Sequence, residues 1–346
     1  MNGVFRPSNP ADLAQIFALL AEAFGAQPGQ GSLDPKAMAW KYWDDRKDWT
    51  EPRSYVIEKD GRIVAHAGIW PVTFRGREPA VRGIQMIDWA SAKDSPGAGL
   101  AIVQRLTRLC DFMYSIGGSA ATRRVLPAFG FAEVTRVWTA ARPLRPLRQI
   151  LTHQAVNWKL APRLIRNWRW SLSPANRAMT DWTTESLDPG QVRDGLIADS
   201  FEEARACPRS REFFEYLLRC PTVQFKLYGM ANQNGPLGYF ALGVALGQAR
   251  VAGVWLKNPT EEHWRAAFIV AQRVARRLPG AFEIAATGSV GESQKAASDA
   301  GLRVIQTTPV FFLSKQRNLA LPKEFQFQMG DDDAAFLDLG QSAYLT

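Results

Sequence analysis

The pattern of hydrophobic and polar positions is clearest between Ile84 and Leu106. An apolar run typical of a buried strand is followed by a Ser-Pro-Gly turn, and apolar residues then recur at helical spacing from Leu100 onward. A strand that turns directly into a helix presents unpaired N–H groups and the positive end of the helix dipole at the turn. The pattern therefore predicts a binding site for an anion such as a phosphate.

Similar units recur along the chain. Residues from Phe112 to Val134 predict a strand, a turn of small residues, a helix and, after Gly130-Phe131, another strand. In the second half, residues from Arg209 to Leu256 predict a helix and three strands, with a hairpin turn at Asn234-Gly235. An amphipathic helix from Thr260 to Leu278 and another strand, turn, helix and strand follow. This period of about 150 residues predicts a duplicated domain.

Gly97 and Gly99 stand in the first of these turns. Because glycine has no Cβ, both would let the backbone approach a bulky anion. The spacing differs from two known phosphate loops, since neither G-x-x-x-x-G-K-[ST] nor G-x-G-x-x-G is present. A corner that uses small residues only for packing is the alternative.

These segments together resemble the GNAT superfamily of N-acetyltransferases. Gly97 and Gly99 match the glycines of its cofactor motif, Q/R-x-x-G-x-G/A, and Gly130-Phe131 match the Gly-Phe of a later motif. Residues 40–42 and 58–71 look like its opening helices and central hairpin, so the resemblance covers about residues 4 to 140.

The resemblance implies an α/β (α+β) fold with two GNAT-like domains, each a twisted mixed sheet flanked by helices. The expected parts are an acyl-CoA-binding domain at residues 1–140, a basic connecting segment at 141–180 and a degenerate second copy at 181–346.

The resemblance further implies acetyl-CoA or a longer acyl-CoA as co-substrate, held by backbone amides of the turn and by pairing with the strand at Trp89. The expected cofactor-binding residues are Trp89, Asp94, Ser95, Gly97, Ala98, Gly99, Leu100 and Ser119. Two of them depart from the family pattern. Asp94 replaces Gln or Arg and would repel a pyrophosphate, and Ser119 replaces Asn.

The residues that many members use for catalysis are also replaced. Leu126 stands where many have a Tyr general acid. Alternation along the strand puts Gln85 on the face that carries the catalytic or substrate-binding Glu of relatives and puts Asp88 on the opposite face. Gln85 cannot accept a proton at neutral pH, but it can hold an amine or orient a water. Gln85 and, as a proton donor, Tyr114 are the candidate catalytic residues. The alternative to a catalytic role is buried packing for Tyr114 and a salt bridge or helix cap for Asp88.

The second copy lacks the glycine motif at the corresponding turn, from Leu256 to Trp264. It has no G-x-G, and Glu261 and Glu262 stand at the helix N-terminus, where they would compensate the dipole and repel an anion. We therefore expect that the second copy does not bind acyl-CoA and instead shapes the acceptor pocket or stabilises the first copy.

The net charge of +9 arises largely between Arg142 and Arg177, where eight Lys or Arg residues and no Asp or Glu occur together with Trp158, Trp168 and Trp170. One interpretation is a connecting helix that packs its Trp and Leu residues between the domains. The second is a peripheral contact with an anionic membrane or glycolipid. The third, contact with nucleic acid, is the least expected.

Other residue types indicate neither a metal site nor export. No apolar run of 18 residues and no signal-peptide pattern is present, so we expect a cytoplasmic protein, with a peripheral position at the inner membrane surface as an option. Cys110, Cys207 and Cys220, and likewise His66, His153 and His263, have no metal-ligand spacing. The run from Asp331 to Asp333 lacks the spacing of a calcium loop, but it could contribute a carboxylate near the pocket of either domain.

The function expected from the resemblance is acyl-CoA-dependent N-acyl transfer, most simply N-acetyl transfer, to a small-molecule amine such as an amino sugar or amino acid. Two alternatives stay open. One is a non-catalytic acyl-CoA-binding or scaffold protein of the same fold. The other is an aminoacyl-tRNA-dependent transferase like the FemAB-type peptidyl transferases, which are also double GNAT folds.

Overall fold

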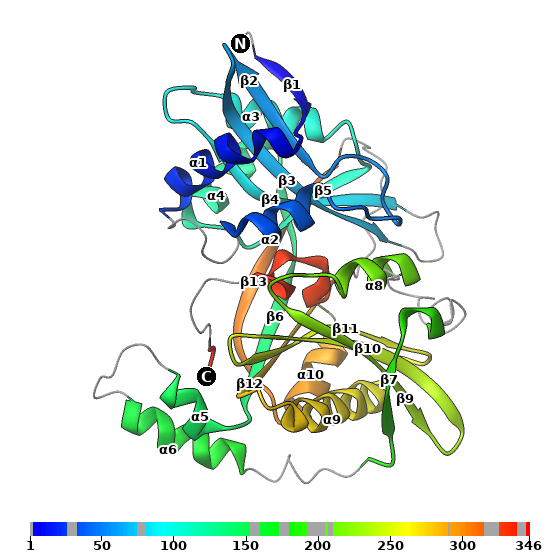
Figure 1. The fold of residues 1–346 in the computed structure, drawn as a ribbon. Coiled ribbons are helices and arrows are strands. Elements are labelled where there is room, and N and C mark those ends of the chain that lie inside the picture. The colour runs from blue at the N-terminus through cyan, green and yellow to red at the C-terminus, as the bar shows by residue number, and fades with distance from the viewer. Residues whose placement is uncertain are drawn as a thin grey trace.

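The computed structural model describes residues 3–25, 33–74, 81–152, 160–172, 180–192, 205–206, 210–289, 291–314, 325–337 and 344–346. His153, Trp158, Arg177 and Cys207 lie outside these ranges. Two α/β halves lie one above the other, with long strands running between them (Figure 1). No described helix is long and apolar enough to cross a membrane.

The N-terminal half has the expected order of elements. They are β1 (Val4–Pro7), α1 (Leu13–Phe24), α2 (Pro35–Tyr42), β2 (Ser54–Lys59), β3 (Arg62–Phe74), β4 (Val81–Ser91), α3 (Ala98–Leu106), β5 (Phe112–Ile116), α4 (Ala120–Val125) and β6 (Ala132–Pro143). Local signals explain the boundaries. The Asp34 carboxylate caps α2 by accepting hydrogen bonds from two backbone N–H groups, and Gly25 ends α1 in the left-handed conformation.

The connecting segment contains α5 (Pro146–Leu151) and α6 (Leu160–Ser171). The C-terminal half contains β7 (Thr183–Leu187), β8 (Arg205–Ala206), α8 (Arg211–Leu217), β9 (Gln224–Asn232), β10 (Gly235–Ala245), β11 (Gln248–Leu256), α9 (Glu261–Arg277), β12 (Glu283–Gly288), α10 (Gly291–Asp299), β13 (Arg303–Ser314) and β14 (Phe325–Gln326). The predicted hairpin turn joins β9 to β10, and the Thr260 side chain caps α9 as expected.

One sheet of twelve described strands runs through both halves in the order β1-β2-β3-β4-β5-β13-β6-β12-β11-β10-β9-β7. The last strand of each half is therefore inserted into the other half. Strand β13 pairs with β5, and β6 pairs with β12, while β6 and β13 pair with each other at the centre. This exchange makes the two halves one continuous hydrogen-bonded structure.

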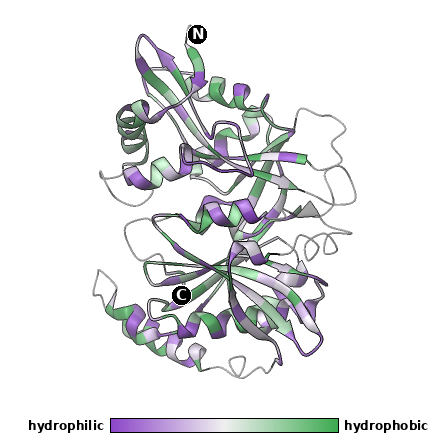
Figure 2. Cartoon of the chain, turned by 45° about the vertical axis from the view of Figure 1, so that its right-hand side comes forward, coloured by the Kyte–Doolittle hydropathy of each residue, from purple (hydrophilic) through white to green (hydrophobic). Residues whose placement is uncertain are grey.

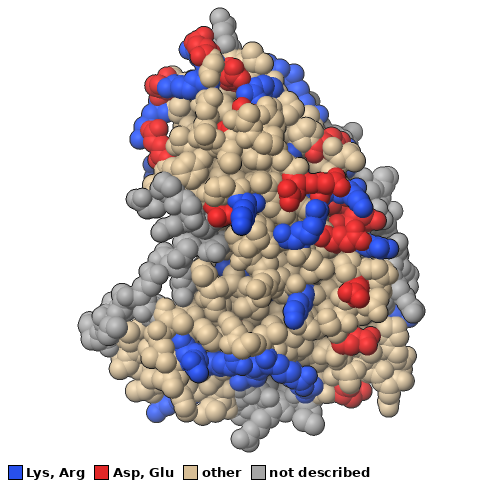
Figure 3. All heavy atoms as spheres, viewed as in Figure 1, with Lys and Arg blue, Asp and Glu red and all other residues tan. Residues whose placement is uncertain are grey.

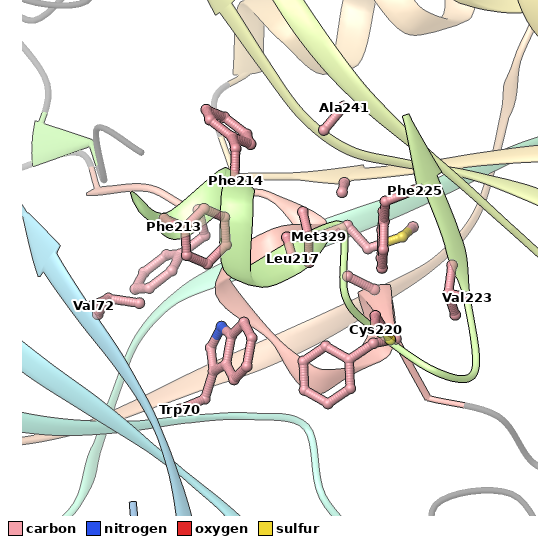
Figure 4. Packing of buried hydrophobic residues seen from close by; sticks show 14 of the residues in the cluster. Trp70, Val72, Phe213, Phe214, Leu217, Cys220, Val223, Phe225, Ala241 and Met329 are labelled. Carbon is pink, nitrogen blue, oxygen red and sulfur yellow. The ribbon is translucent and has the colours of Figure 1, made fainter. Parts of the chain in front are cut away.

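A large aromatic core lies between the halves. Tyr216 on α8 stacks on Trp40 of α2 with ring centroids 4.7 Å apart, and Arg53 on the neighbouring loop donates to the Tyr216 hydroxyl at 2.6 Å. Figure 4 shows Trp70 and Val72 from β3 facing the α8 residues Phe213, Phe214 and Leu217 and the segment around Met329. The segment from Phe325 to Phe336, here called the strap, runs through this core.

Candidate active site

Strands β4 and β5 separate in the middle of the N-terminal sheet. They pair in parallel at three positions only, Gly83 with Phe112, Ile84 with Met113 and Gln85 with Tyr114. Beyond Gln85, β4 continues to Ser91 without pairing with β5. The expected separation of the two strands, here called the splay, is thus present. Trp89 lies on the part of β4 that has no β5 partner.

The turn between β4 and α3 can present backbone donors to an anion. Gly97 has φ of 83°, a conformation that side chains rarely adopt, and no side chain caps the α3 N-terminus. A Cβ on Gly99 would lie 3.1 Å from the Ser91 hydroxyl, so the helix approaches the strand closely. Trp89 packs edge-on against Phe129, and its buried Nε1 has no hydrogen-bond partner among the described residues.

The remaining residues predicted around this turn differ in what they can contribute. Ala98 is fully buried, so only its backbone can contact a ligand, and the Ser119 side chain already caps α4 through Thr122 N. Asp94 accepts two hydrogen bonds from Arg62 at 2.6 and 2.7 Å, which lower the pKa of its carboxyl. Arg62 therefore offsets part of the charge with which Asp94 is expected to repel a pyrophosphate. The orphan indole and the uncapped helix fit the phosphate and pantetheine groups of an acyl-CoA.

The strap brings a carboxylate to the point where β4 and β5 separate. The amide Nε2 of Gln85 donates to Asp332 at 2.5 Å, and the Tyr114 hydroxyl donates to the main-chain oxygen of Asp331. Trp70 Nε1 donates to Gly330 O at 3.0 Å. Gln85 Oε1 is buried without a partner among the described residues, so an acceptor for an N–H group remains there. Tyr114 is fully buried and holds the strap, which fits the packing alternative better than proton donation.

Asp332 and Asp333 are adjacent carboxyl groups in the strap. Burial raises the pKa of Asp332, while its hydrogen bonds with Asp333 and Gln85 oppose the rise. Burial and the neighbouring Asp332 charge raise the pKa of Asp333 well above its usual range. The pair therefore holds one proton more readily than two isolated aspartates would, and Asp332 is the member that faces Gln85.

Asp88 corrects the face assignment made from alternation. It has φ of 48°, and Asp88 and Trp89 together stand opposite the single residue Ala67 of β3. This bulge shifts the alternation, so the Asp88 carboxylate lies buried among Lys41 and Tyr42, close enough to raise the pKa of Asp333.

The bulge is held by buried polar groups. Burial raises the pKa of Asp88, but the charge and hydrogen bond of Lys41 and the Tyr42 hydroxyl outweigh it and leave the pKa below its usual range. His66 contacts the main-chain oxygen of Asp88 through Nδ1 at 2.9 Å and the Ser54 hydroxyl through Nε2 at 2.9 Å. Burial lowers the pKa of His66 to about 4, so this histidine is neutral and structural.

The second copy fills its own splay. Strands β11 and β12 pair only from Gln248 to Val251 on β11, and Val254 beyond them corresponds in position to Trp89. The side chain of Gln328 accepts a hydrogen bond from Val254 N at 2.6 Å and donates to Val254 O at 3.0 Å. The strap thus occupies the gap between β11 and β12 in the second half. The equivalent gap between β4 and β5 in the N-terminal half is open. At the start of α9, Thr260 caps the helix and Glu261 pairs with Lys295.

These contacts include residues that the sequence did not reveal. Gln328, Lys41 and the Asp332–Gln85 contact depend on segments that meet only in the folded chain. One pattern in the sequence could have indicated the strap. Phe325, Phe327 and Met329 alternate with polar residues just before the acidic run, which indicates a buried strand that leads into that run. No group of three or more His, Cys, Asp or Glu in the described ranges is arranged to hold a metal ion.

Comparisons with known proteins agree with this geometry. Residues 4–114 match the family model described as acetyltransferase (GNAT) domain. None of the curated protein sequences matches the chain.

Several solved structures share the fold. A probable N-acyltransferase from Enterococcus faecalis is 10% identical with a TM-score of 0.58, over 91% of this chain and 72% of that chain. A tandem GNAT protein from the clavulanic acid biosynthesis pathway is 11% identical with a TM-score of 0.52, over 90% and 98%. The N-myristoyltransferase of Saccharomyces cerevisiae with bound myristoyl-CoA is 14% identical with a TM-score of 0.59, over 99% and 86%.

At these identities the likeness concerns the fold, and the family match concerns the N-terminal segment. The structural likeness confirms the predicted fold class, and the family match over residues 4–114 agrees with the predicted kind of enzyme, an acyltransferase. Residues 4–114 of this chain thus resemble an acetyltransferase (GNAT) domain, and the whole chain shares the fold of a tandem GNAT protein.

Proposed function

We propose that the N-terminal half binds acetyl-CoA or a longer acyl-CoA and that the chain transfers the acyl group to an amine, with Asp332 of the strap as general base. The observation that carries this proposal is the contact between Asp332 and Gln85, because it places a carboxylate of raised pKa where β4 and β5 begin to separate. A base whose pKa lies closer to neutrality transfers protons more effectively at physiological pH.

The residues of the splay would hold the co-substrate. Backbone N–H groups at Gly97 to Leu100 suit the pyrophosphate, and the free side of β4 at Trp89 suits the pantetheine arm. When bound, acyl-CoA would supply an activated thioester. The amine nitrogen would bond to its carbonyl carbon as the C–S bond breaks, and the proton that the amine loses would end on the departing CoA thiolate. The Trp89 indole, buried without a described partner, is a further donor for this ligand.

The remaining steps fall to the chain's own groups. Gln85 Oε1 can accept a hydrogen bond from the acceptor amine and so orient it, and the Asp332 carboxylate can take the proton that the amine loses. Burial and the Asp332 charge raise the pKa of Asp333, so the pair favours one negative charge over two. The aromatic residues around the strap limit access of water.

A non-catalytic acyl-CoA-binding protein is the second candidate. It is favoured by Gln85, which replaces an ionisable residue, and by Leu126, which is fully buried and cannot act as an acid. The tRNA-dependent alternative has less support, because Arg142, Arg145 and Arg163 donate to main-chain oxygens of the chain itself.

Calorimetric titration with acetyl-CoA tests the binding step. Gly99→Glu places a carboxylate at the α3 N-terminus and should abolish measurable binding while the circular dichroism spectrum stays unchanged. Gly97→Glu should also abolish it, but the φ of 83° makes that variant less stable as well. The matched control is Gly291→Glu, at the start of α10 in open space, which should bind like the native chain.

Unchanged affinity in Gly99→Glu would show that the turn is not the cofactor site. Release of free CoA thiol from acyl-CoA donors of several lengths, with mixed amines, amino sugars and amino acids, then tests transfer. Binding without any turnover across these mixtures would favour the non-catalytic candidate.

A further inference from the structure

Helices α5 and α6 expose an unusual share of hydrophobic side chains. Among the described residues twelve large hydrophobic side chains are exposed, and five of them lie within this one segment. They are Leu147, Leu151, Ile165, Trp168 and Leu172. Trp168 is 51% exposed and Leu151 is 71% exposed. Scattered exposed hydrophobic residues are ordinary in proteins, but a group on two adjacent helices marks an interaction surface.

The exposed hydrophobic residues of α6, with Leu172 directly after it, follow one face. Ile165, Trp168 and Leu172 are spaced by three and four positions, while Asn167 and Trp170 on the other side are buried. Figure 2 shows hydrophobic and hydrophilic residues alternating along both helices at the edge of the C-terminal half. The helices are thus held on the protein by one side and present an amphipathic side outward.

The arginines of the segment divide into two groups. Three are used internally. Arg142 is fully buried and donates to Trp170 O, Arg145 donates to four main-chain oxygens at the end of α9 and just after it, and Arg163 donates to Thr346 O. The guanidinium groups of these three arginines therefore bind the protein itself, and only Arg163 among them belongs to a helix.

The second group faces outward. Arg148, Arg166 and Arg169 are exposed, and none forms an ion pair with a described carboxylate, although Arg166 donates two hydrogen bonds to Asn167 Oδ1, at 3.0 and 2.9 Å. From residue 142 to residue 177 the sequence has no Asp or Glu. In Figure 3, Lys and Arg atoms gather over the lower part of the C-terminal half, and the acidic atoms on that part lie toward the right. We call the exposed set Leu147, Arg148, Leu151, Ile165, Arg166, Trp168, Arg169 and Leu172 the α5–α6 patch.

We propose that the α5–α6 patch binds the surface of a lipid bilayer that contains anionic phospholipids. Arginines beside exposed aliphatic residues and a tryptophan match such a surface, because the apolar side chains enter the headgroup boundary while the guanidinium groups contact phosphates. A nucleic acid would satisfy the arginines but leave Leu151 and Ile165 in water. The patch lies at the far end of the molecule from the β4–α3 turn (Figure 1), so this contact is independent of the proposed acyl transfer.

Co-sedimentation of the full chain with vesicles tests the proposal. The chain should sediment with vesicles of phosphatidylcholine and phosphatidylglycerol, and not with phosphatidylcholine alone. The triple variant Arg148→Gln, Arg166→Gln, Arg169→Gln should bind roughly 100-fold more weakly, since each surface arginine contributes about fivefold. The double variant Ile165→Ser, Trp168→Ser should also lose binding, while its helix content by circular dichroism stays native.

Matched controls come from the N-terminal half. Arg105→Gln, Arg108→Gln, Arg124→Gln removes three other exposed arginines, and Leu109→Ser, Val125→Ser removes two other exposed hydrophobic residues. Both should bind vesicles like the native chain. The proposal is overturned if the chain ignores anionic vesicles, if it binds neutral vesicles equally well, or if the controls lose as much binding. It is also overturned if the patch variants only prevent self-association or RNA binding.

Discussion

Gln85 and Asp332 are hydrogen-bonded although 247 residues separate them in the sequence. Gln85 belongs to the last pair of residues that join β4 to β5, and Asp332 belongs to the strap that has already passed through the splay of the second half. The second copy thus contributes to the first site through a segment that fills its own site. A segment of the second half therefore positions the candidate base of the site in the first half.

Asp332→Asn and Asp333→Asn should have opposite consequences. The amide introduced by Asp332→Asn cannot accept a proton, so kcat should fall by roughly 100-fold to 10,000-fold while the affinity for acyl-CoA stays native. The amide introduced by Asp333→Asn resembles the protonated carboxyl of Asp333 and can still donate to Asp332, so most activity should remain at neutral pH. Steady-state kinetics of CoA release on both variants provide the measurement.

The pH profile gives a second readout for the same pair. Because the pKa of Asp332 is raised, the native rate should fall as the pH drops through a value above the usual carboxyl pKa of about 3.9. In Asp332→Asn the residual rate should lack this acidic limb. Full activity of Asp332→Asn would remove Asp332 from the mechanism.

His66 should make the fold sensitive to mild acid. Its pKa is about 4 in the folded chain and 6.5 as a free side chain, so below pH 6.5 the unfolded chain takes up a proton that the folded chain does not. The contribution of neutral His66 to the free energy of unfolding is fully present above pH 6.5. It is lost as the pH falls toward 4, and the loss is on the order of 3 kcal/mol.

Urea denaturation at several pH values measures this loss. The native chain should lose stability between pH 6.5 and 4 more steeply than His66→Gln, which has no imidazole to protonate. His263→Gln, which removes a histidine near the surface of α9, is the control for the substitution. Equal slopes in the native chain and His66→Gln would contradict the assignment of His66 as a buried neutral group.

Features set by neighbouring residues could be predicted from the sequence. Gly97 and Gly99 mark the turn, Thr260 with Glu261 marks the closed helix of the second copy, and Asn234 marks a hairpin. Each depends on backbone chemistry within a few residues, such as the left-handed conformation of Gly97. The duplication was visible for the same reason, since both halves repeat the order of strand, turn and helix, although the second half lacks the two glycines.

Features set by distant contacts could not be predicted. The bulge at Asp88 adds one residue to β4 and reverses the face assignment, and no local pattern announces it. The exchange of β6 and β13 leaves the hydrophobic pattern of each strand unchanged, because a strand presents the same faces to either neighbour. Gln328 reads as an ordinary polar residue until Val254 is placed beside it.

Gln328 should matter for both stability and catalysis. Gln328→Met has a similar length but leaves Val254 N and Val254 O without these partners, which should lower the free energy of unfolding by about 2 kcal/mol or more. The strap would loosen, so kcat should fall while the affinity for acyl-CoA remains. Thermal melting and CoA release measure the two effects. Gln306→Met, on an exposed position of β13, is the control and should change neither.

The exchanged strands predict that the halves do not fold independently. Residues 1–172 alone lack β13, which lies between β5 and β6 in the sheet, so both strands would keep an unpaired edge. This fragment should aggregate or remain unfolded when expressed alone. Co-expression with residues 173–346 should give a soluble complex, recovered through a tag on one fragment, with the native circular dichroism spectrum. A folded, monomeric fragment 1–172 would show that β13 is dispensable and that the central pairing only docks two independent domains.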